Sequence, residues 1–403
     1  MVERPQPHLV ECPLPPVSRL HLDELTGPFG IWQHATGIIP NQAHGTCTDD
    51  VARALLVDLL HRAPLGWPAV RADARRSLDY LRTAFVPSTA SFRNFRSKDG
   101  TWLEASGSQD SQGRAVLTLG TVIADAPEAS LRSDAAALLG QALPGVLRLT
   151  ALRAIASSLL GCARALDAGE SGDVETTFRV LADRLRRPFA RAAADAEWPW
   201  PEPILTYENA LLPRALIVAG DRLSDSNLRA TGLAVLDWLI GVQTGPDGSF
   251  APIGSDGWWP RGGTRSRFDQ QPIEATATIL AAVAASRSTG DERYGRAAEA
   301  ALGWFLGANP LGLPVAEVRT GGCHDGVSPF RLNANQGAES TLMWQIALEQ
   351  VRLLRSERAS SVLLQLPGRP PKAQTSRVPP PIIRRPAVTR LAAPRPTIAR
   401  VTA

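Results

Sequence analysis

The stretch that decides the fold runs from Asp269 to Ala275 and reads Asp269-Gln270-Gln271-Pro272-Ile273-Glu274-Ala275. A polar turn here leads directly into a helix rich in Ala. The arrangement recurs at four other places, each of which combines an acid with Asn, Gln, Tyr or Arg: residues 48–54, 108–115, 206–210 and 335–341. A junction that recurs in this way indicates a repeated structural unit.

Helical periodicity fills the chain between these junctions. Apolar residues fall at i, i+3, i+4 and i+7, and Gly, Pro or Asp separates one such run from the next. The runs predict helices in consecutive pairs, namely 51–62 with 72–85, 113–124 with 131–143, 151–166 with 175–194, 210–219 with 227–240, and 273–286 with 293–306, followed by 337–354. Almost no alternating run is long enough for a strand, so the sequence predicts an all-α fold.

The junctions are evenly spaced. Asp50 and Asp110 are 60 residues apart, Glu208 and Asp269 are 61 apart, and Asp269 and Gln336 are 67 apart. The gap of 98 residues between Asp110 and Glu208 is about two steps, and the third helix pair falls inside it. One helical hairpin with its loops has this length. If such hairpins close into a ring, the N-termini of all inner helices lie on one face, and their polar turns converge on a central cleft.

Helix capping is the simpler explanation of any single junction. Asp, Ser, Thr and Asn are preferred N-caps, and acids are favoured in a first turn. Five junctions in step, each mixing an acid with other polar side chains, exceed what capping requires.

The charge of the chain is unevenly distributed. The 403 residues carry a net charge of +4, but residues 358–403 hold nine basic residues and no acidic one, which leaves 34 basic against 39 acidic residues before them. The acidic body argues against nucleic acid as the main ligand. Basic residues separated by prolines predict a disordered tail at 357–403, either passive or touching an anionic surface. We expect an extended segment at 1–19 and a helical domain at 20–356.

Other features of the sequence exclude further classes. The four cysteines are far apart and indicate neither a disulfide framework nor a zinc site. The Pro-rich N-terminus has no apolar core of a signal peptide, and no apolar stretch approaches the length of a membrane span. We therefore expect a cytoplasmic protein.

Five segments resemble a known family: residues 25–35, 44–50, 110–115, 269–275 and 335–341. They are similar to bacterial six-hairpin glycosidase-like domains, which resemble (α/α)6 toroid enzymes and occur alone or attached to glycosyltransferase domains. The similarity covers roughly residues 20–355. It implies an (α/α)6 toroid and a carbohydrate-linked role, with a glycosyltransferase as a possible partner, but it carries no defined reaction.

The sequence departs from the pattern of that family at three positions. Members commonly have Asn where this chain has Val51, an acid at Gln109 and His at Gln112. The departures leave open a change of specificity or a non-catalytic relative.

Cleavage of a glycosidic bond needs a proton donor and a carboxylate that activates water or attacks the anomeric carbon. Asp50, Asp110, Glu208 and Asp269 are the candidates because each opens an inner helix. Our hypothesis makes Asp110 and Asp269 the acid/base pair, with Asp50 and Glu208 holding sugar hydroxyls. Toroid glycosidases mostly invert, which predicts carboxylates about 6.5–9.5 Å apart. No cofactor is expected.

The remaining candidates are residues that would bind substrate. Trp258 and Trp259, in a Gly-rich loop, suit stacking on a pyranose, although such a loop also packs over a toroid. Trp198 and Trp200 offer further aromatic surface. Polar side chains at the junctions and in neighbouring loops complete the set, namely His44, Asp49, Arg114, Tyr207, Gln270, His324, Asn335, Gln336 and Glu339.

A metal site is not expected. Cys323-His324-Asp325 has no second ligand pair, and adjacent residues rarely chelate one ion. Cys47 and Cys323 would act as nucleophiles only beside an activating base.

Three classes of function remain. The leading one is an enzyme acting on an oligosaccharide or glycan, most readily a glycoside hydrolase, with epimerase, lyase and phosphorylase as alternatives on the same fold. The second is a non-catalytic glycan-binding or scaffolding partner of a glycosyltransferase. The third, a helical scaffold of the prenyltransferase-like or solenoid kind, predicts an apolar centre, and the polar junctions argue against it.

Overall fold

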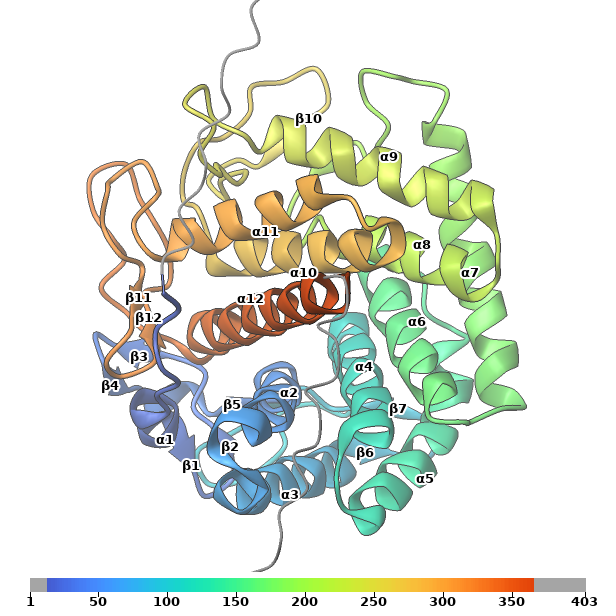
Figure 1. Ribbon diagram of the computed structural model, residues 1–403. Helices are drawn as coiled ribbons and strands as arrows, with labels where there is room; N and C mark the ends of the chain where they lie inside the picture. Colours follow the sequence, from blue (N-terminus) through green and yellow to red (C-terminus); the bar gives the residue numbers. More distant parts are fainter. Residues whose placement is uncertain (1–12, 366–403) are drawn as a thin grey trace, which may run out of the picture. The chain divides into compact units, whose positions relative to one another are not determined.

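Every predicted helix forms in the computed structural model, which describes residues 13–365. Five inner helices begin at or just after the polar junctions, and the sixth, α6, is the first helix of the third predicted pair. The inner helices are α2 (Thr48–Leu65), α4 (Gln109–Asp125), α6 (Leu152–Asp167), α8 (Leu211–Arg222), α10 (Pro272–Thr289) and α12 (Ala338–Gln365). The outer helices follow them in sequence: α3 (Trp67–Ala84), α5 (Ala129–Val146), α7 (Asp173–Ala192), α9 (Ser226–Val242) and α11 (Glu292–Phe305). Figure 1 shows the inner helices around a common centre. The fold is the (α/α)6 toroid that the sequence predicts.

The strands of the described residues are only two residues long. They pair antiparallel within the connections: β1 (Thr26–Gly27) with β2 (Gly30–Ile31), β3 (Ala35–Thr36) with β4 (Ile39–Pro40), β5 (Thr46–Cys47) with β8 (Phe95–Arg96), β6 (Phe85–Val86) with β7 (Ser91–Phe92), β9 (Ile204–Leu205) with β10 (Trp259–Pro260), and β11 (Ala316–Glu317) with β12 (Gly322–Cys323). They stiffen the loops on which several candidate residues lie.

Small residues let the inner helices approach closely. A β-carbon at Gly120 of α4 would lie 1.9 Å from the carbonyl oxygen of Gly161 on α6, and one at Gly161 would lie 2.3 Å from the carbonyl oxygen of Val116. The two backbones are therefore in direct contact. This close packing explains why the inner helices are rich in Ala and Gly.

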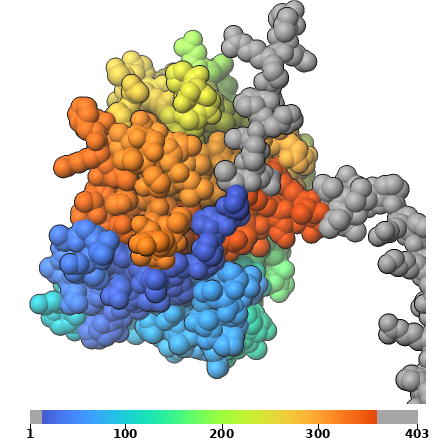
Figure 2. All heavy atoms as spheres, turned by 60° about the vertical axis from the view of Figure 1, so that its left-hand side comes forward, coloured from blue at the N-terminus to red at the C-terminus, as the bar shows by residue number. Residues whose placement is uncertain are grey.

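The ring closes between the first and last inner helices. Thr276 of α10 donates a hydrogen bond to the Met343 carbonyl of α12 (2.9 Å), and Arg53 of α2 forms an ion pair with Glu339 of α12 (2.8 Å). The short helix α1 (Leu20–Leu25), which the periodicity did not predict, packs Leu22 and Leu25 into the same apolar cluster as α12. Figure 2 shows this N-terminal segment, in blue, against the orange segment that precedes α12.

The predicted boundary of the C-terminal tail needs correction. Helix α12 extends beyond the predicted end at Leu354 to Gln365, so residues 357–365 are helical rather than part of a tail. Residues 366–403 and 1–12 of the predicted terminal segments lie outside the described residues. By its internal contacts the chain divides after Ala359, and the toroid belongs to the first unit.

Candidate active site

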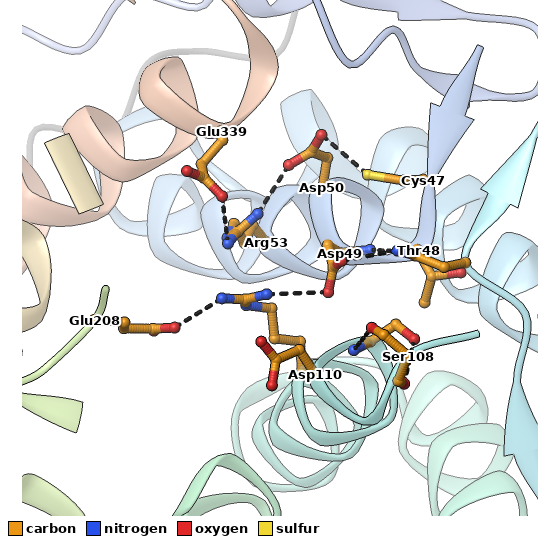
Figure 3. A network of polar contacts seen from close by, with 12 residues as sticks. Cys47, Thr48, Asp49, Asp50, Arg53, Ser108, Asp110, Glu208 and Glu339 are labelled. Atoms are coloured by element: carbon orange, nitrogen blue, oxygen red, sulfur yellow. Dashed lines mark hydrogen bonds and ion pairs between the residues drawn. The ribbon is translucent and has the colours of Figure 1, made fainter. Parts of the chain in front are cut away.

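Acids and arginines from four inner-helix starts meet at the centre of the toroid. We call this group the charged layer; its members are Asp49, Asp50, Arg53, Asp110, Arg114, Glu208 and Glu339. Figure 3 shows the labelled side chains of the layer converging from α2, α4, α12 and the segment before α8. The prediction that the polar junctions share one centre is therefore correct for these junctions.

The first half of the charged layer is built around Arg53. Its guanidinium pairs with Asp50 (2.9 Å) and with Glu339 (2.8 Å). The second Asp50 oxygen accepts a hydrogen bond from the Cys47 thiol (3.1 Å). Burial raises the pKa of Asp50 to about 6, although Arg53 opposes the shift. With both oxygens engaged and only 4% of its surface exposed, Asp50 orients Arg53 and is too enclosed for the predicted contact with sugar hydroxyls.

The second half is built around Arg114. This guanidinium donates to Asp49 (3.2 Å) and to Glu208 (2.7 Å), and so joins α2 to the segment before α8. Asn94, which the sequence analysis did not select, donates to the other Asp49 oxygen (3.1 Å). Each arginine of the layer thus holds two carboxylates in place.

Asp110 has a different partner. Its carboxylate accepts a hydrogen bond from the Tyr207 hydroxyl and forms no ion pair among the described residues. The Tyr207 ring stacks on the Arg153 guanidinium (4.6 Å from the ring centroid), and Arg153 also donates to the Tyr207 carbonyl (2.5 Å). Burial, reinforced by Asp110, raises the pKa of Tyr207, so the phenol stays protonated and donates to Asp110.

Glu208 lies on a strained turn. Its backbone has φ of +48°, a region that non-glycine residues seldom occupy. The buried carboxylate of Glu274 accepts hydrogen bonds from the Glu208 amide and from the Asn209 side chain (3.2 Å). Burial raises the pKa of Glu274 to about 7. Glu274 therefore supports the turn that directs Glu208 into the charged layer.

Asp269 lies apart from the charged layer in the network of contacts. It is exposed, and its side chain has no hydrogen-bond or ion-pair partner within residues 13–365. Its backbone carbonyl accepts from the Ser255 amide (2.8 Å), which ties it to the Gly-rich loop of residues 254–263. That loop in turn pairs with residues 203–205, directly before Tyr207.

The predicted aromatic platform is divided between two roles. Trp259 stacks on Trp238 of α9 (ring centroids 6.1 Å apart, planes at 12°) and meets Trp198 edge to face at 5.1 Å. Trp198 and Trp200 are buried, which corrects their assignment as aromatic surface for sugar. Trp258 is half-buried with φ of +57°, outside this indole cluster, and is the remaining indole of the loop for a stacking role.

Four further candidates have packing roles. The Gln270 side chain is buried and accepts from the Trp304 indole (2.7 Å), and Gln336 is buried with its backbone carbonyl bound by His21 (2.8 Å). Asn335 accepts from the Gly37 amide (3.0 Å), and His324 bonds the Asn333 carbonyl (2.7 Å). These contacts fix the loops around the N-terminus of α12, so the polar composition of this stretch reflects loop structure.

His44 lies beside His34, a residue that was not among the sequence-based candidates. The exposed rings of His34 and His44 meet edge to face, with centroids 4.8 Å apart. The carboxyl group of Asp325 lies near both His34 and Glu339, and burial raises its pKa. His34 follows Trp32-Gln33 in a short loop without a helical junction, so periodicity could not have selected it.

The three departures from the family pattern have structural roles. Val51 is buried in the core. Gln109 accepts from the Thr150 and Ala151 amides (2.7 and 2.8 Å), next to the start of α6. Gln112 accepts from the Phe92 amide (3.0 Å) and donates to the Ala90 carbonyl (3.2 Å). Each of the three side chains is therefore engaged in packing or in hydrogen bonds within the fold.

The described residues offer little for metal or thiol chemistry. No group of three His, Cys, Asp or Glu side chains within residues 13–365 is arranged to hold a metal ion. Burial raises the pKa of the Cys47 and Cys323 thiols, which disfavours the thiolate that nucleophilic catalysis needs. Helices of this part of the chain are too short or too polar to cross a membrane.

Comparison by sequence finds no matching family model and no matching curated protein. Solved structures do share the fold. A cellobiose 2-epimerase from Spirochaeta thermophila superposes with a TM-score of 0.64 at 12% identity, over 83% of this chain and 92% of that one. A sugar epimerase from a ruminal bacterium gives 0.63 at 12%, over 83% and 94%. A GH76 α-mannanase from Bacteroides thetaiotaomicron gives 0.59 at 9%, over 84% and 94%. At these identities the likeness establishes the fold.

Proposed function

We propose that this protein is a carbohydrate-active enzyme that hydrolyses a glycosidic bond in an oligosaccharide or glycan, with Asp110 and Asp269 as its acid/base pair. One observation carries the proposal. Of the six acids at the junctions other than the buried Glu274, four are neutralised by Arg53 or Arg114, whereas Asp110 and Asp269 form no ion pair among the described residues. A carboxylate without an arginine partner is free to accept or donate a proton during a reaction.

The surrounding residues suit this chemistry. The Tyr207 hydroxyl orients Asp110, while the backbone of Asp269 is hydrogen-bonded to the loop that carries Trp258. Asp49, Glu208 and Glu339 keep part of their surface exposed and accept hydrogen bonds from sugar hydroxyls in this scheme. The enzymes among the structural neighbours, which include an α-mannanase, lend support at the level of the fold.

The test compares the wild type with Asp110→Asn and Asp269→Asn on a panel of manno-, gluco- and galacto-oligosaccharides. Each substitution removes a titratable group while keeping its shape, so we expect turnover to fall by about 10²- to 10⁴-fold. Glu170→Gln, an exposed acid in the loop between α6 and α7, is the matched control and should retain full activity. Turnover that survives both Asp substitutions contradicts the assignment.

A sugar epimerase or isomerase is the second candidate, and the edge-to-face pair of His34 and His44 favours it. Two adjacent exposed imidazoles suit removal and return of a proton at a sugar carbon. Incubation with the same sugars in D₂O separates the two candidates. An epimerase incorporates deuterium at carbon and loses activity in His34→Asn, whereas a hydrolase releases shorter sugars without carbon-bound deuterium.

A non-catalytic glycan-binding partner of a glycosyltransferase remains the alternative proposal. It predicts that sugar stabilises the wild type and both Asp variants alike against heat, with no product from any of them. We propose a cytoplasmic location with either role.

A further inference from the structure

The centre of the toroid is hollow beneath the charged layer. A cavity of about 410 Å³ begins at Arg53, Arg114 and Glu208 and extends along the inner helices to Arg62 in the last turn of α2. From Arg53 to Arg62 the helix advances about 14 Å. A second cavity of about 480 Å³ shares Arg164, Arg214 and Arg287 with the first and opens at the opposite end of the toroid from the charged layer. We call the two together the central channel.

One stretch of the wall of the central channel is apolar, between the charged layer and the arginines at the far end. Leucines of α2, α4 and α10 face it together with residues of α12, namely Leu56, Leu60, Leu117, Leu280, Met343 and Ile346. An apolar centre is what a helical scaffold of the prenyltransferase-like kind predicts. The toroid has such a centre beneath the charged layer, in addition to the polar junctions that argued against this class. An apolar, enclosed wall of this kind suits a hydrocarbon better than a sugar.

The far half of the central channel is basic. Arg164 is neutralised by Asp125 (2.8 Å), and Arg287 by Glu357 (2.7 Å). The guanidinium groups of Arg62 and Arg214, by contrast, have no hydrogen-bond or ion-pair partner among the described residues, although both line the cavity. Arg214 also lies in the first turn of α8, where the helix dipole disfavours a cation.

Arg214 is therefore a half-buried positive charge without a direct ion-pair partner among the described residues. Its burial lowers the pKa of the guanidinium to about 10; Glu208 opposes this shift, and the positive charges of Arg287 and Arg164 add to it. A buried charge without a partner is costly, and natural proteins normally pair such a group. An anion bound beside Arg214 supplies the missing partner.

We propose that the central channel binds a single-chain amphiphile, an unbranched alkyl chain with an anionic head. The head pairs with Arg214 and Arg62, and the alkyl chain lies along the leucines toward the charged layer. Charge complementarity fixes the sign of the head, and the apolar wall fixes the nature of the chain. This inference does not depend on the sugar chemistry, because neither Arg214 nor Arg62 belongs to the charged layer or to the proposed acid/base pair.

Calorimetric titration of the full chain with octyl phosphate and octanoate tests the proposal. We expect both to bind more tightly than inorganic phosphate, which lacks the chain, and than octanol, which lacks the charge. Arg214→Met keeps the apolar stem and removes the charge, so affinity should fall about 10- to 100-fold. The ligand-free variant should be no less stable than the wild type, whereas loss of a structural arginine would lower its melting temperature.

A second variant tests the apolar half of the central channel. Ala277 lines it, so Ala277→Phe should fill the space and weaken octyl phosphate binding while leaving any binding of inorganic phosphate unchanged. Arg179→Met, on the exposed face of α7, is the control and should bind as the wild type does. Inorganic phosphate binding as tightly as octyl phosphate, octyl phosphate binding unaffected by Arg214→Met, or no binding at all each overturns the proposal.

Discussion

At the scale of single residues, Arg19 joins two buried groups of α2 whose pKa values move in opposite directions. Its guanidinium pairs with Asp58 (2.8 Å) and lies 3.3 Å from Nδ1 of His61. Burial raises the pKa of Asp58 to about 7, against the effect of Arg19, and burial lowers the pKa of His61 to about 3, with Arg19 adding to the shift. Both side chains are 1% exposed, so the shifts act on stability with little screening by solvent.

These two shifts predict opposite dependences of stability on pH. Between about pH 4.5 and 6 the folded chain holds a proton on Asp58 that the unfolded chain lacks, and lacks a proton on His61 that the unfolded chain holds. The two contributions nearly cancel. In Asp58→Asn the His61 contribution remains, so stability relative to the wild type should fall on acidification from pH 7 toward 4, by up to about 1.4 kcal/mol per pH unit. In His61→Asn the Asp58 contribution remains, so stability relative to the wild type should fall instead as pH rises from about 4 to 7.

Urea unfolding at half-unit steps of pH measures both differences. Asp79→Asn, an exposed acid on α3, should run parallel to the wild type. If all the variants ran parallel to the wild type, the two groups would not titrate as the structure indicates.

At the scale of elements, the contact between α4 and α6 depends on two glycines. Because a β-carbon at Gly120 would lie 1.9 Å from a backbone oxygen of α6, Gly120→Ala should force the helices apart. We expect it to cost roughly 3 kcal/mol, in the range of severe overpacking. Gly140→Ala is the matched control on α5, since a β-carbon there has no neighbour within 4 Å. It should stabilise the fold by about 0.5–1 kcal/mol through higher helix propensity. Thermal unfolding of the two variants distinguishes a close backbone approach from a general intolerance of alanine.

The same elements show how far the sequence alone could lead. Apolar periodicity predicted the inner and outer helices because their burial follows one face of each helix. It placed the start of α2 at Val51 rather than Thr48, because the polar residues 48–50 form the first turn of the helix instead of a turn before it. It missed α1, whose six residues are too few to show a period.

The candidate site was predictable where its residues open helices and not where they depend on distant partners. Asp49, Asp110, Arg114 and Glu208 meet as expected, because closing the ring brings the helix starts together. Nothing local reveals that Asn94 holds Asp49, or that a loop histidine stands beside His44. Conversely, Gln270 and Gln336 resemble ligand-binding residues in sequence but are buried among neighbouring loops.

At the scale of the whole toroid, the fold is closed by residues from the two ends of the described chain. Leu22 of α1 packs in one cluster with Leu342 and Ile346 of α12, about 320 residues later, and with Val57 of α2. The inner helices form a continuous ring of contacts, so a defect at this closure should reach both helices that meet there.

Leu22→Ala removes a buried side chain and should cost about 2–5 kcal/mol. Amide hydrogen exchange should then show protection lost in α2 and α12 together. Leu20→Ala, on the same short helix but 64% exposed, should leave both unchanged. Protection lost only around residue 22 would mean that α1 docks on a ring that is already closed without it, by contacts of α12 such as Arg53–Glu339, Thr276–Met343 and Phe305–Trp344.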